Sequence, residues 1–311
     1  MLGDIMKRPS ENETMNVMHR ISLNSDKRFV QLLKDCGFPV QHGTYSVFEI
    51  GENDPRWNTV EALCRKFPSE LGDFQYYTDF TKEELETAEY YVMLSEWHFG
   101  YPQPEDGFAY EHTTYKADSG CRECGVGLVQ AQSFSVRKQP TWRAKSIAQL
   151  NWVFDEFFVS SMPKRQLMER NLPIQFMDVL KYPKGTPFDD MFQIVIDRKV
   201  DIDSNLLIGT ASTCPVCGRM KYPGQTRGFF PELEEKDFLI ARTGLFGSGH
   251  AAHNYILISK EMYTIFKELK VKGVSYVPCK NPQSRYEYQK KGEASVSVKC
   301  EVLSHWNASK K

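Results

Sequence analysis

The chain has 311 residues, of which 41% are hydrophobic and 25% charged. This composition is typical of a globular protein of about two domains, and a chain of this length buries a core without disulfide bonds. It contains no run of about 18 uncharged apolar residues, and residues 1–20 lack the apolar stretch of a secretory signal. The sequence therefore excludes a membrane span and predicts a cytoplasmic protein, in which thiols stay reduced.

Charge is unevenly distributed along the chain, although the net charge is only −1. Residues 1–115 hold 10 basic and 20 acidic side chains, residues 116–259 hold 18 and 15, and residues 260–311 hold 11 and 5. Such a separation of charge steers a charged partner, although ordinary solvated surfaces have the same composition. Both interpretations stay open.

The first third of the chain is predicted to contain helices joined by strands. Residues 26–36, 54–67 and 81–92 each combine a capping signal with apolar residues at helical spacing. In the third of these segments, Thr81 and Glu84 have the spacing of a capping box.

Residues 101–115 are rich in proline and glycine, which predicts irregular structure. We place a domain boundary after this segment. An acidic, aromatic-rich region is expected at residues 1–118, and a duplicated α+β domain at residues 119–311.

The second domain contains a weak internal repeat, with units of about 119–200 and 212–300. Each unit is predicted to hold a strand that ends in a serine, a helix that this serine caps, and a second strand. In chain order, the two sets are 156–160, 162–170 and 174–179, and then 255–259, 262–270 and 274–279. Together with the helical N-terminal region, this pattern predicts the α+β fold class.

Each unit also has a Cys-x-x-Cys-Gly motif upstream, formed by Cys121, Cys124 and Gly125 in the first and by Cys214, Cys217 and Gly218 in the second. Two such turns provide the four thiolates of a tetrahedral zinc site. The 89 residues between the motifs exceed the usual zinc-ribbon spacing, but duplication accounts for them. We therefore predict one structural Zn²⁺ on Cys121, Cys124, Cys214 and Cys217. A redox dithiol and thiols without a metal are the alternatives.

Residues 244–253 contain three glycines, His250 and His253 between two predicted strands. A loop between strands does not open a helix, so it lacks the helix N-terminus that binds phosphate. We predict a mobile hairpin loop, with His250 and His253 as candidate ligand contacts.

The stretch from Asp79 to Glu111 holds nine acids, one base and many aromatic residues. Aromatic anchors ringed by charge are typical of a protein interface, although a helix and loop packed on the core have the same pattern. The residues singled out as partner contacts are Glu83, Glu84, Glu86, Trp97 and Tyr101.

No sequence signature of a nucleophilic or metal-dependent hydrolase is present, so no catalytic residue is predicted. The sequence favours a non-enzymatic binding protein. One alternative is a zinc-ribbon nucleic-acid-binding protein that uses basic residues of 260–311, such as Lys267 and Arg285. An enzyme built around His250 and His253 is another.

The two Cys-x-x-Cys-Gly motifs, each ahead of a strand–Ser–helix–strand unit, resemble the double-CXXCG motif proteins. The resemblance covers roughly residues 119–280 and does not extend to the acidic N-terminal third. That family includes immunity proteins of bacterial polymorphic toxin systems. The resemblance implies a zinc-binding, non-enzymatic cytoplasmic protein that neutralises a cognate toxin by binding it. The acidic N-terminal third would suit a basic toxin.

Overall fold

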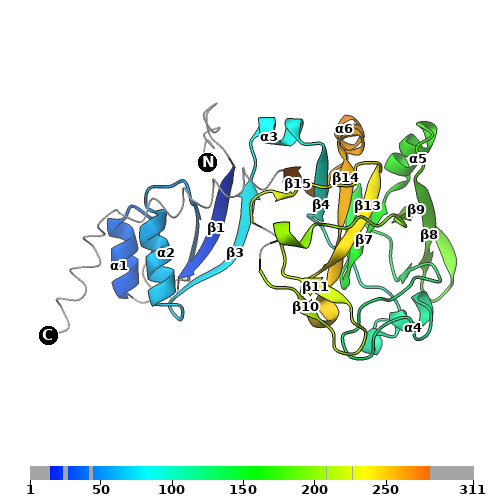
Figure 1. Cartoon of the computed structure of the whole chain (residues 1–311), viewed down its shortest axis with the longest axis horizontal. Helices are drawn as coiled ribbons and strands as arrows, with labels where there is room; N and C mark the ends of the chain where they lie inside the picture. The colour runs from blue at the N-terminus through cyan, green and yellow to red at the C-terminus, as the bar shows by residue number, and fades with distance from the viewer. Residues whose placement is uncertain (1–14, 24–26, 42–44, 208, 226, 281–311) are drawn as a thin grey trace. The chain divides into compact units, whose positions relative to one another are not determined.

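The computed structural model describes residues 15–23, 27–41, 45–207, 209–225 and 227–280. They form two compact units (Figure 1): the described residues up to Thr87 with residues 227–229, and Ala88–Gln225 with Phe230–Lys280. The division at Thr87 lies upstream of the predicted boundary at residue 118, because β4 (Tyr90–Ser95) pairs with strands far along the chain. None of the helices in the described ranges is long and apolar enough to cross a membrane.

The smaller unit is an antiparallel three-stranded sheet of order β2-β1-β3 with helices α1 and α2. Its elements are β1 (Asn16–Leu23), α1 (Lys27–Asp35), β2 (Ser46–Gly51), α2 (Trp57–Lys66), β3 (Leu71–Asp79) and α3 (Lys82–Thr87). The helices predicted at 26–36 and 54–67 are therefore present, and Asp26 lies outside the described residues. Leu33 of α1 and Val60 of α2 are fully buried in one core with Ile21 of β1.

The third predicted helix begins as expected but ends early. Thr81 N–H donates to Glu84 Oε2 at 2.9 Å, and Glu84 N–H donates to Thr81 Oγ1 at 3.2 Å, so the capping box forms. The prediction that the helix continues to Val92 is wrong, because residues 90–95 form β4. Tyr91 lies in one core and Val92 in another, so both faces of this strand are buried. A strand buried on both faces lacks the alternation that would have marked it.

The larger unit is a mixed α+β structure with two sheets. One has seven strands in the order β10-β11-β13-β14-β4-β15-β12, and the other has five in the order β5-β8-β9-β7-β6. Its further strands are β5 (Ser135–Val136), β6 (Ile147–Leu150), β7 (Val153–Val159), β8 (Gln175–Lys181), β9 (Thr186–Val195), β10 (Ser212–Thr213), β11 (Met220–Tyr222), β12 (Phe230–Pro231), β13 (Ile240–Phe246), β14 (His253–Ser259) and β15 (Val274–Lys280). Its helices are η1 (Asp106–Phe108), α4 (Tyr110–Thr114), α5 (Ser161–Glu169), η2 (Ser204–Leu206), η3 (Gly249–Ala251) and α6 (Lys260–Glu268).

Both predicted strand–helix–strand segments are present, as β7–α5–β8 and β14–α6–β15. Ser160 and Ser259 occupy the N-cap positions, and the Ser259 hydroxyl accepts a hydrogen bond from Met262 N–H at 3.2 Å. In each segment the two strands flank a third strand that is antiparallel to both, which is β9 in the first and β4 in the second.

The two sheets match strand by strand beyond these segments. β6 and β13 pair antiparallel with β7 and β14, and β5 and β12 pair parallel with β8 and β15. The register matches as well. Phe176 of β8 lies opposite Ile194 of β9, and at the equivalent position Tyr276 of β15 lies opposite Met93 of β4. Five strands therefore follow one order in both sheets.

In each sheet, the middle strand of these five comes from the other half of the chain. β4 precedes β5–β8 in the sequence but lies between β14 and β15, as Figure 1 shows, and β9 lies between β7 and β8. After β4 the chain runs along β6, where Phe99 N–H donates to Gln149 O at 2.8 Å. After β9 it runs along β13, where Val200 N–H donates to Arg242 O at 2.9 Å. The two halves thus exchange their leading strands reciprocally.

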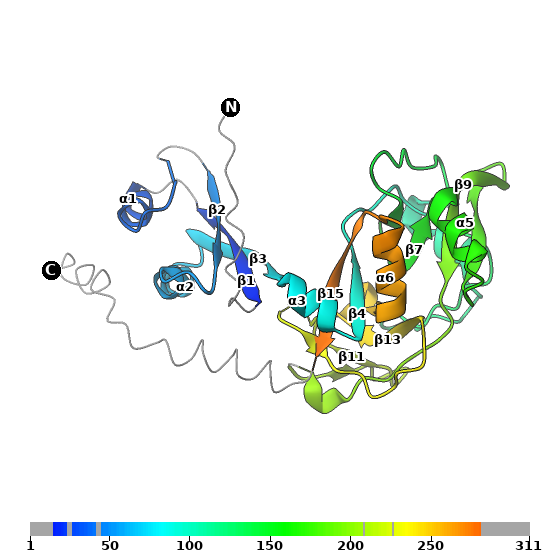
Figure 2. The ribbon, with the colours of Figure 1, turned by 90° about the horizontal axis from the view of Figure 1, so that it is seen from above.

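One core joins the inner faces of both sheets to helices α5 and α6. Helix α6 packs on β4 and β14, and α5 packs on β9 (Figure 2). Phe266 of α6, Phe157 of β7 and Ile258 of β14 are almost fully buried in this core. Burial of side chains of this size contributes about 2 kcal/mol each, so the shared core holds both halves together.

Candidate metal centre

The two Cys-x-x-Cys turns come from different parts of the larger unit. The first follows α4 and precedes β5, and the second joins β10 to β11 at the end of the seven-stranded sheet. Both turns have the same local geometry. Gly125 N–H donates to Cys121 O at 2.7 Å, and Gly218 N–H donates to Cys214 O at 2.9 Å. Both glycines have a φ near +70°, which side chains disfavour, so glycine closes each turn without strain.

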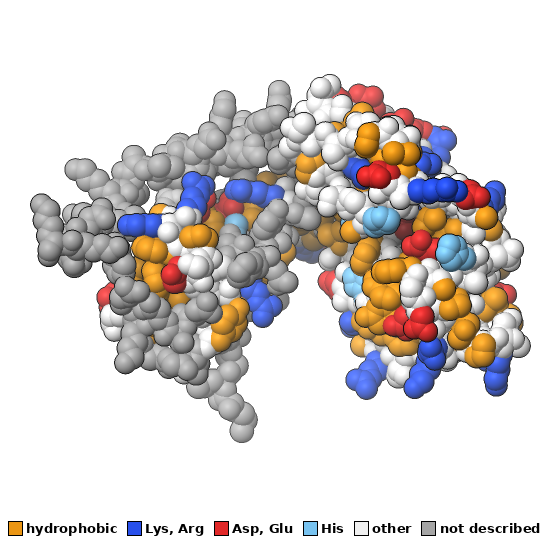
Figure 3. All heavy atoms as spheres, turned by 90° about the horizontal axis from the view of Figure 1, so that it is seen from below, with side chains coloured by type: hydrophobic (Ala, Val, Ile, Leu, Met, Phe, Trp, Pro, Cys, Tyr) orange, Lys and Arg blue, Asp and Glu red, His pale blue; other side chains and the backbone are white. Residues whose placement is uncertain are grey.

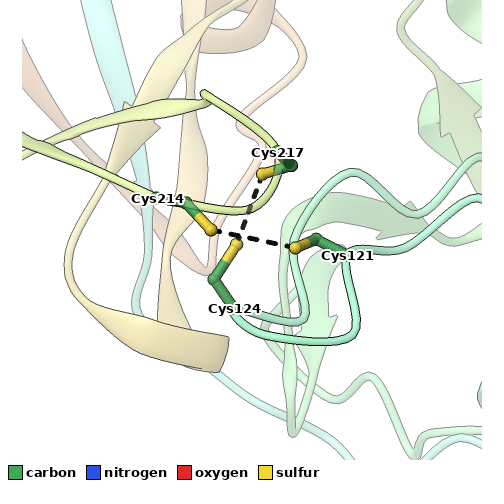
Figure 4. Close-up of side chains that lie close together, drawn as sticks. All are labelled: Cys121, Cys124, Cys214 and Cys217. Atoms are coloured by element: carbon green, nitrogen blue, oxygen red, sulfur yellow. Dashed lines mark hydrogen bonds between the residues drawn. The ribbon is translucent and has the colours of Figure 1, made fainter.

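The four thiols converge on one point (Figure 4). Cys121 Sγ lies 3.8 Å from Cys214 Sγ, and Cys124 Sγ lies 3.7 Å from Cys217 Sγ, with all four sulfurs within 4.8 Å of one another. A disulfide would bring two sulfurs to about 2.05 Å, so these are separate thiols. Tetrahedral Zn²⁺ with Zn–S bonds of about 2.3 Å places its sulfurs about 3.8 Å apart. The spacing and the donor set therefore fit one ion such as zinc.

The local environment favours thiolates on the second turn. The N–H groups of Cys217 and Val216 lower the pKa of Cys214, and the N–H of Arg219 lowers the pKa of Cys217 to about 6. Burial instead raises the pKa of Cys124. Since metals bind thiolates and not thiols, these N–H groups favour the metal-binding form of the second turn.

The glycine-histidine loop lies against this cluster. Residues 247–252 connect β13 to β14 as a hairpin, as predicted, and Leu245 and Ala252 pack on the cysteines. The His250 ring occupies the space that a side chain at residue 125 would fill. His253 Nδ1 lies 3.0 Å from Ala251 O, and its ring contacts Phe154. In the described part of the chain, the four cysteines form the one group suited to a metal, and neither histidine belongs to it.

A buried polar network, which sequence patterns did not indicate, links the two sheets. Arg242 of β13 donates to Glu156 Oε1 of β7 at 2.7 Å, and Gln193 of β9 donates to Glu156 Oε2 at 2.9 Å. Gln130, a few residues after the first cysteine turn, exchanges hydrogen bonds with Gln193 at 2.7 and 2.8 Å. Glu156 and Gln193 are no more than 5% exposed. Isolated charged or amide residues in a strand carry no spacing signal, so only the structure reveals their convergence.

Glu156 is expected to make stability depend on pH. Burial raises the pKa of its carboxyl to about 7, against the opposing effect of Arg242. The folded chain therefore binds this proton more tightly than the unfolded chain, and stability falls as pH rises from about 5 to above 7. We expect a loss of about 2 kcal/mol between pH 5.5 and 7.5 from this residue, measured by urea unfolding. Glu156→Gln replaces the carboxyl with an amide that does not titrate, so it should flatten the dependence of stability on pH. An unchanged slope would contradict the assignment of this dependence to Glu156.

The predicted partner contacts fall in both units. Glu83, Glu84 and Glu86 lie on α3 of the smaller unit, where Glu84 closes the capping box and also accepts from Met15 N–H at 3.1 Å. Trp97 and Tyr101 belong to the larger unit. The Trp97 ring is half-buried, with Lys145 Nζ 5.1 Å from its centroid, whereas Tyr101 is exposed.

Neither a comparison of the chain with protein-family models nor a search of curated proteins gives a match. The structure by itself defines an α+β protein with a buried four-cysteine cluster suited to a metal ion.

Proposed function

We propose that Cys121, Cys124, Cys214 and Cys217 hold one structural zinc ion. The convergence of four thiols at zinc-like spacing supports this. Four cysteine ligands fill a tetrahedral ion and leave no position for substrate, so the ion would serve stability and not catalysis. The matching order of the two sheets further supports an origin by duplication, with one cysteine turn contributed by each copy.

We propose further that the chain is a binding protein that neutralises a cognate bacterial toxin. The observation that carries this proposal is the closed four-cysteine site, which the resemblance to double-CXXCG immunity proteins associates with toxin neutralisation. The acidic side chains of residues 1–115 support a basic partner, because opposite charge accelerates association and favours the right partner.

Affinity capture of the tagged full chain, washed at high salt, tests the proposal. We expect a single polypeptide to be retained, to stop growth when it is expressed alone, and to be tolerated when the chain is co-expressed. If nucleic acid is captured instead, in an amount that falls as the salt concentration of the wash rises, the zinc-ribbon alternative would be favoured. A retained polypeptide that is harmless to cells would contradict the immunity function.

The acidic face of α3 has its own test in the growth assay. Glu83→Lys with Glu86→Lys should weaken protection against a basic toxin, because both side chains are exposed. Glu84 is left intact, since its loss would break the capping box. Glu169→Lys, at an exposed acid on α5, is the matched control. Full protection by the double variant would exclude α3 as the contact.

A further inference from the structure

Two large aromatic residues of the larger unit adopt a left-handed backbone conformation. Phe108 has a φ of +57° and Trp152 a φ of +69°. Trp152 occupies the second position of the two-residue turn between β6 and β7, where glycine is favoured. Bulky side chains in this region cost free energy, and such strain gathers at functional sites.

Burial accounts for these two residues only in part. Phe108 is 50% exposed and Trp152 36% exposed, and both rings also contact the buried ring of Tyr110. Each ring therefore keeps a substantial part of its surface in solvent, at a position where the backbone is strained.

The two rings belong to one exposed cluster. The Trp152 ring lies 4.6 Å from the Tyr101 ring and 4.6 Å from the Phe108 ring, between centroids. Tyr101 is 38% exposed, and so is Phe154, two residues beyond Trp152. Figure 3 shows hydrophobic side chains gathered beside acidic and histidine side chains on a face of this unit. Exposed tryptophan and tyrosine are the residues most enriched at binding hot spots.

The segment that carries half of this cluster is acidic. Residues 97–115 contain Glu105, Asp106 and Glu111 and no lysine or arginine. Arg137 approaches from outside the segment and donates to Gln103 Oε1 at 3.1 Å. Lys145 Nζ lies 5.1 Å from the Trp97 ring, so two bases border a segment that holds three acids. The segment keeps an excess of negative charge, which complements a cationic ligand.

We propose that Tyr101, Phe108 and Trp152 form a docking surface for a basic segment of a polypeptide. Its arginine or lysine side chains would stack on the exposed ring faces and pair with the surrounding acids. The identity of that polypeptide as a toxin rests on the proposed function, but the surface itself does not. Recognition by these rings explains why the strained backbone is kept.

Asparagine variants separate binding from folding, because asparagine tolerates the left-handed conformation. The probe is a fluorescein-labelled octapeptide of alternating arginine and glycine, followed by anisotropy against the full chain at low salt. We expect Phe108→Asn with Trp152→Asn to weaken binding about tenfold. The melting temperature should fall only modestly, because asparagine relieves the backbone strain while some buried ring surface is lost. Tyr77→Ala, an exposed tyrosine of the smaller unit, should bind like the wild type. The same peptide with glutamate for arginine should not bind.

Unchanged peptide affinity in the double variant would overturn the proposal, and so would a large fall in melting temperature, which would show that the rings serve folding. The growth assay distinguishes this surface from the proposed function. If the double variant weakens peptide binding but no toxin is found, the docking surface stands and its partner is not a toxin. Full protection by the double variant, with a confirmed toxin, would show that the toxin binds elsewhere on the chain, and the proposed function would stand.

Discussion

Replacing Cys214 by serine is expected to abolish zinc binding and to lower the melting temperature of the larger unit by about 10 °C. One lost ligand leaves three sulfurs, which hold zinc far more weakly, and Cys121 and Cys124 stay buried without their ion. A loss of about 4 kcal/mol in a unit of this size corresponds to a shift of that order.

Metal analysis and calorimetry on the same preparations test this expectation. The wild type should contain about one zinc per chain and the variant almost none. Cys64→Ser is the matched control, since Cys64 is a partly buried thiol of the smaller unit, distant in sequence from the cluster. A wild type that folds stably without any metal, or a variant with an unchanged melting temperature, would show that the thiols need no ion.

Features that depend on local spacing were predictable from the sequence. The cysteine turns, the helices α5 and α6 that follow Ser160 and Ser259, and the hairpin around His250 each have their signal within about ten residues. The tetrahedral grouping of the four cysteines also followed, because duplication implies that equivalent turns meet. These predictions held because a turn or a cap is decided by neighbours in the chain.

Features decided by distant partners were not predictable. The helix expected over residues 81–92 overlaps the start of β4, because the buried run of Tyr91, Val92 and Met93 has no alternation and the partners of this strand lie about 165 residues away in β14. The Glu156–Arg242 pair joins strands of different sheets. The strained backbone of Trp152 has no sequence mark either, since most turns of this type contain glycine.

The second large effect concerns the exchanged strands. We expect the chain to stay assembled after cleavage in the turn between β8 and β9, at a protease site inserted between Lys184 and Gly185. Both residues are exposed, so the insertion is tolerated. The first fragment contributes β4 to the sheet of the second, and the second contributes β9 to the sheet of the first. Each fragment alone lacks the middle strand of its own set of five, so its part of the larger unit should not fold.

Size-exclusion chromatography of the cleaved protein provides the measurement. The two fragments should elute together in buffer and separate only in urea, because β4 and β9 are each hydrogen-bonded on both sides. Zinc would also join the fragments, since each carries one cysteine turn, so the experiment is repeated with a chelator. If the fragments still elute together in the presence of the chelator, the exchanged strands β4 and β9 hold them together. Val92→Asp, which places a charge in the buried centre of β4, should then release the fragments. Separation by the chelator alone would mean that the ion, and not the strand exchange, holds the two halves together.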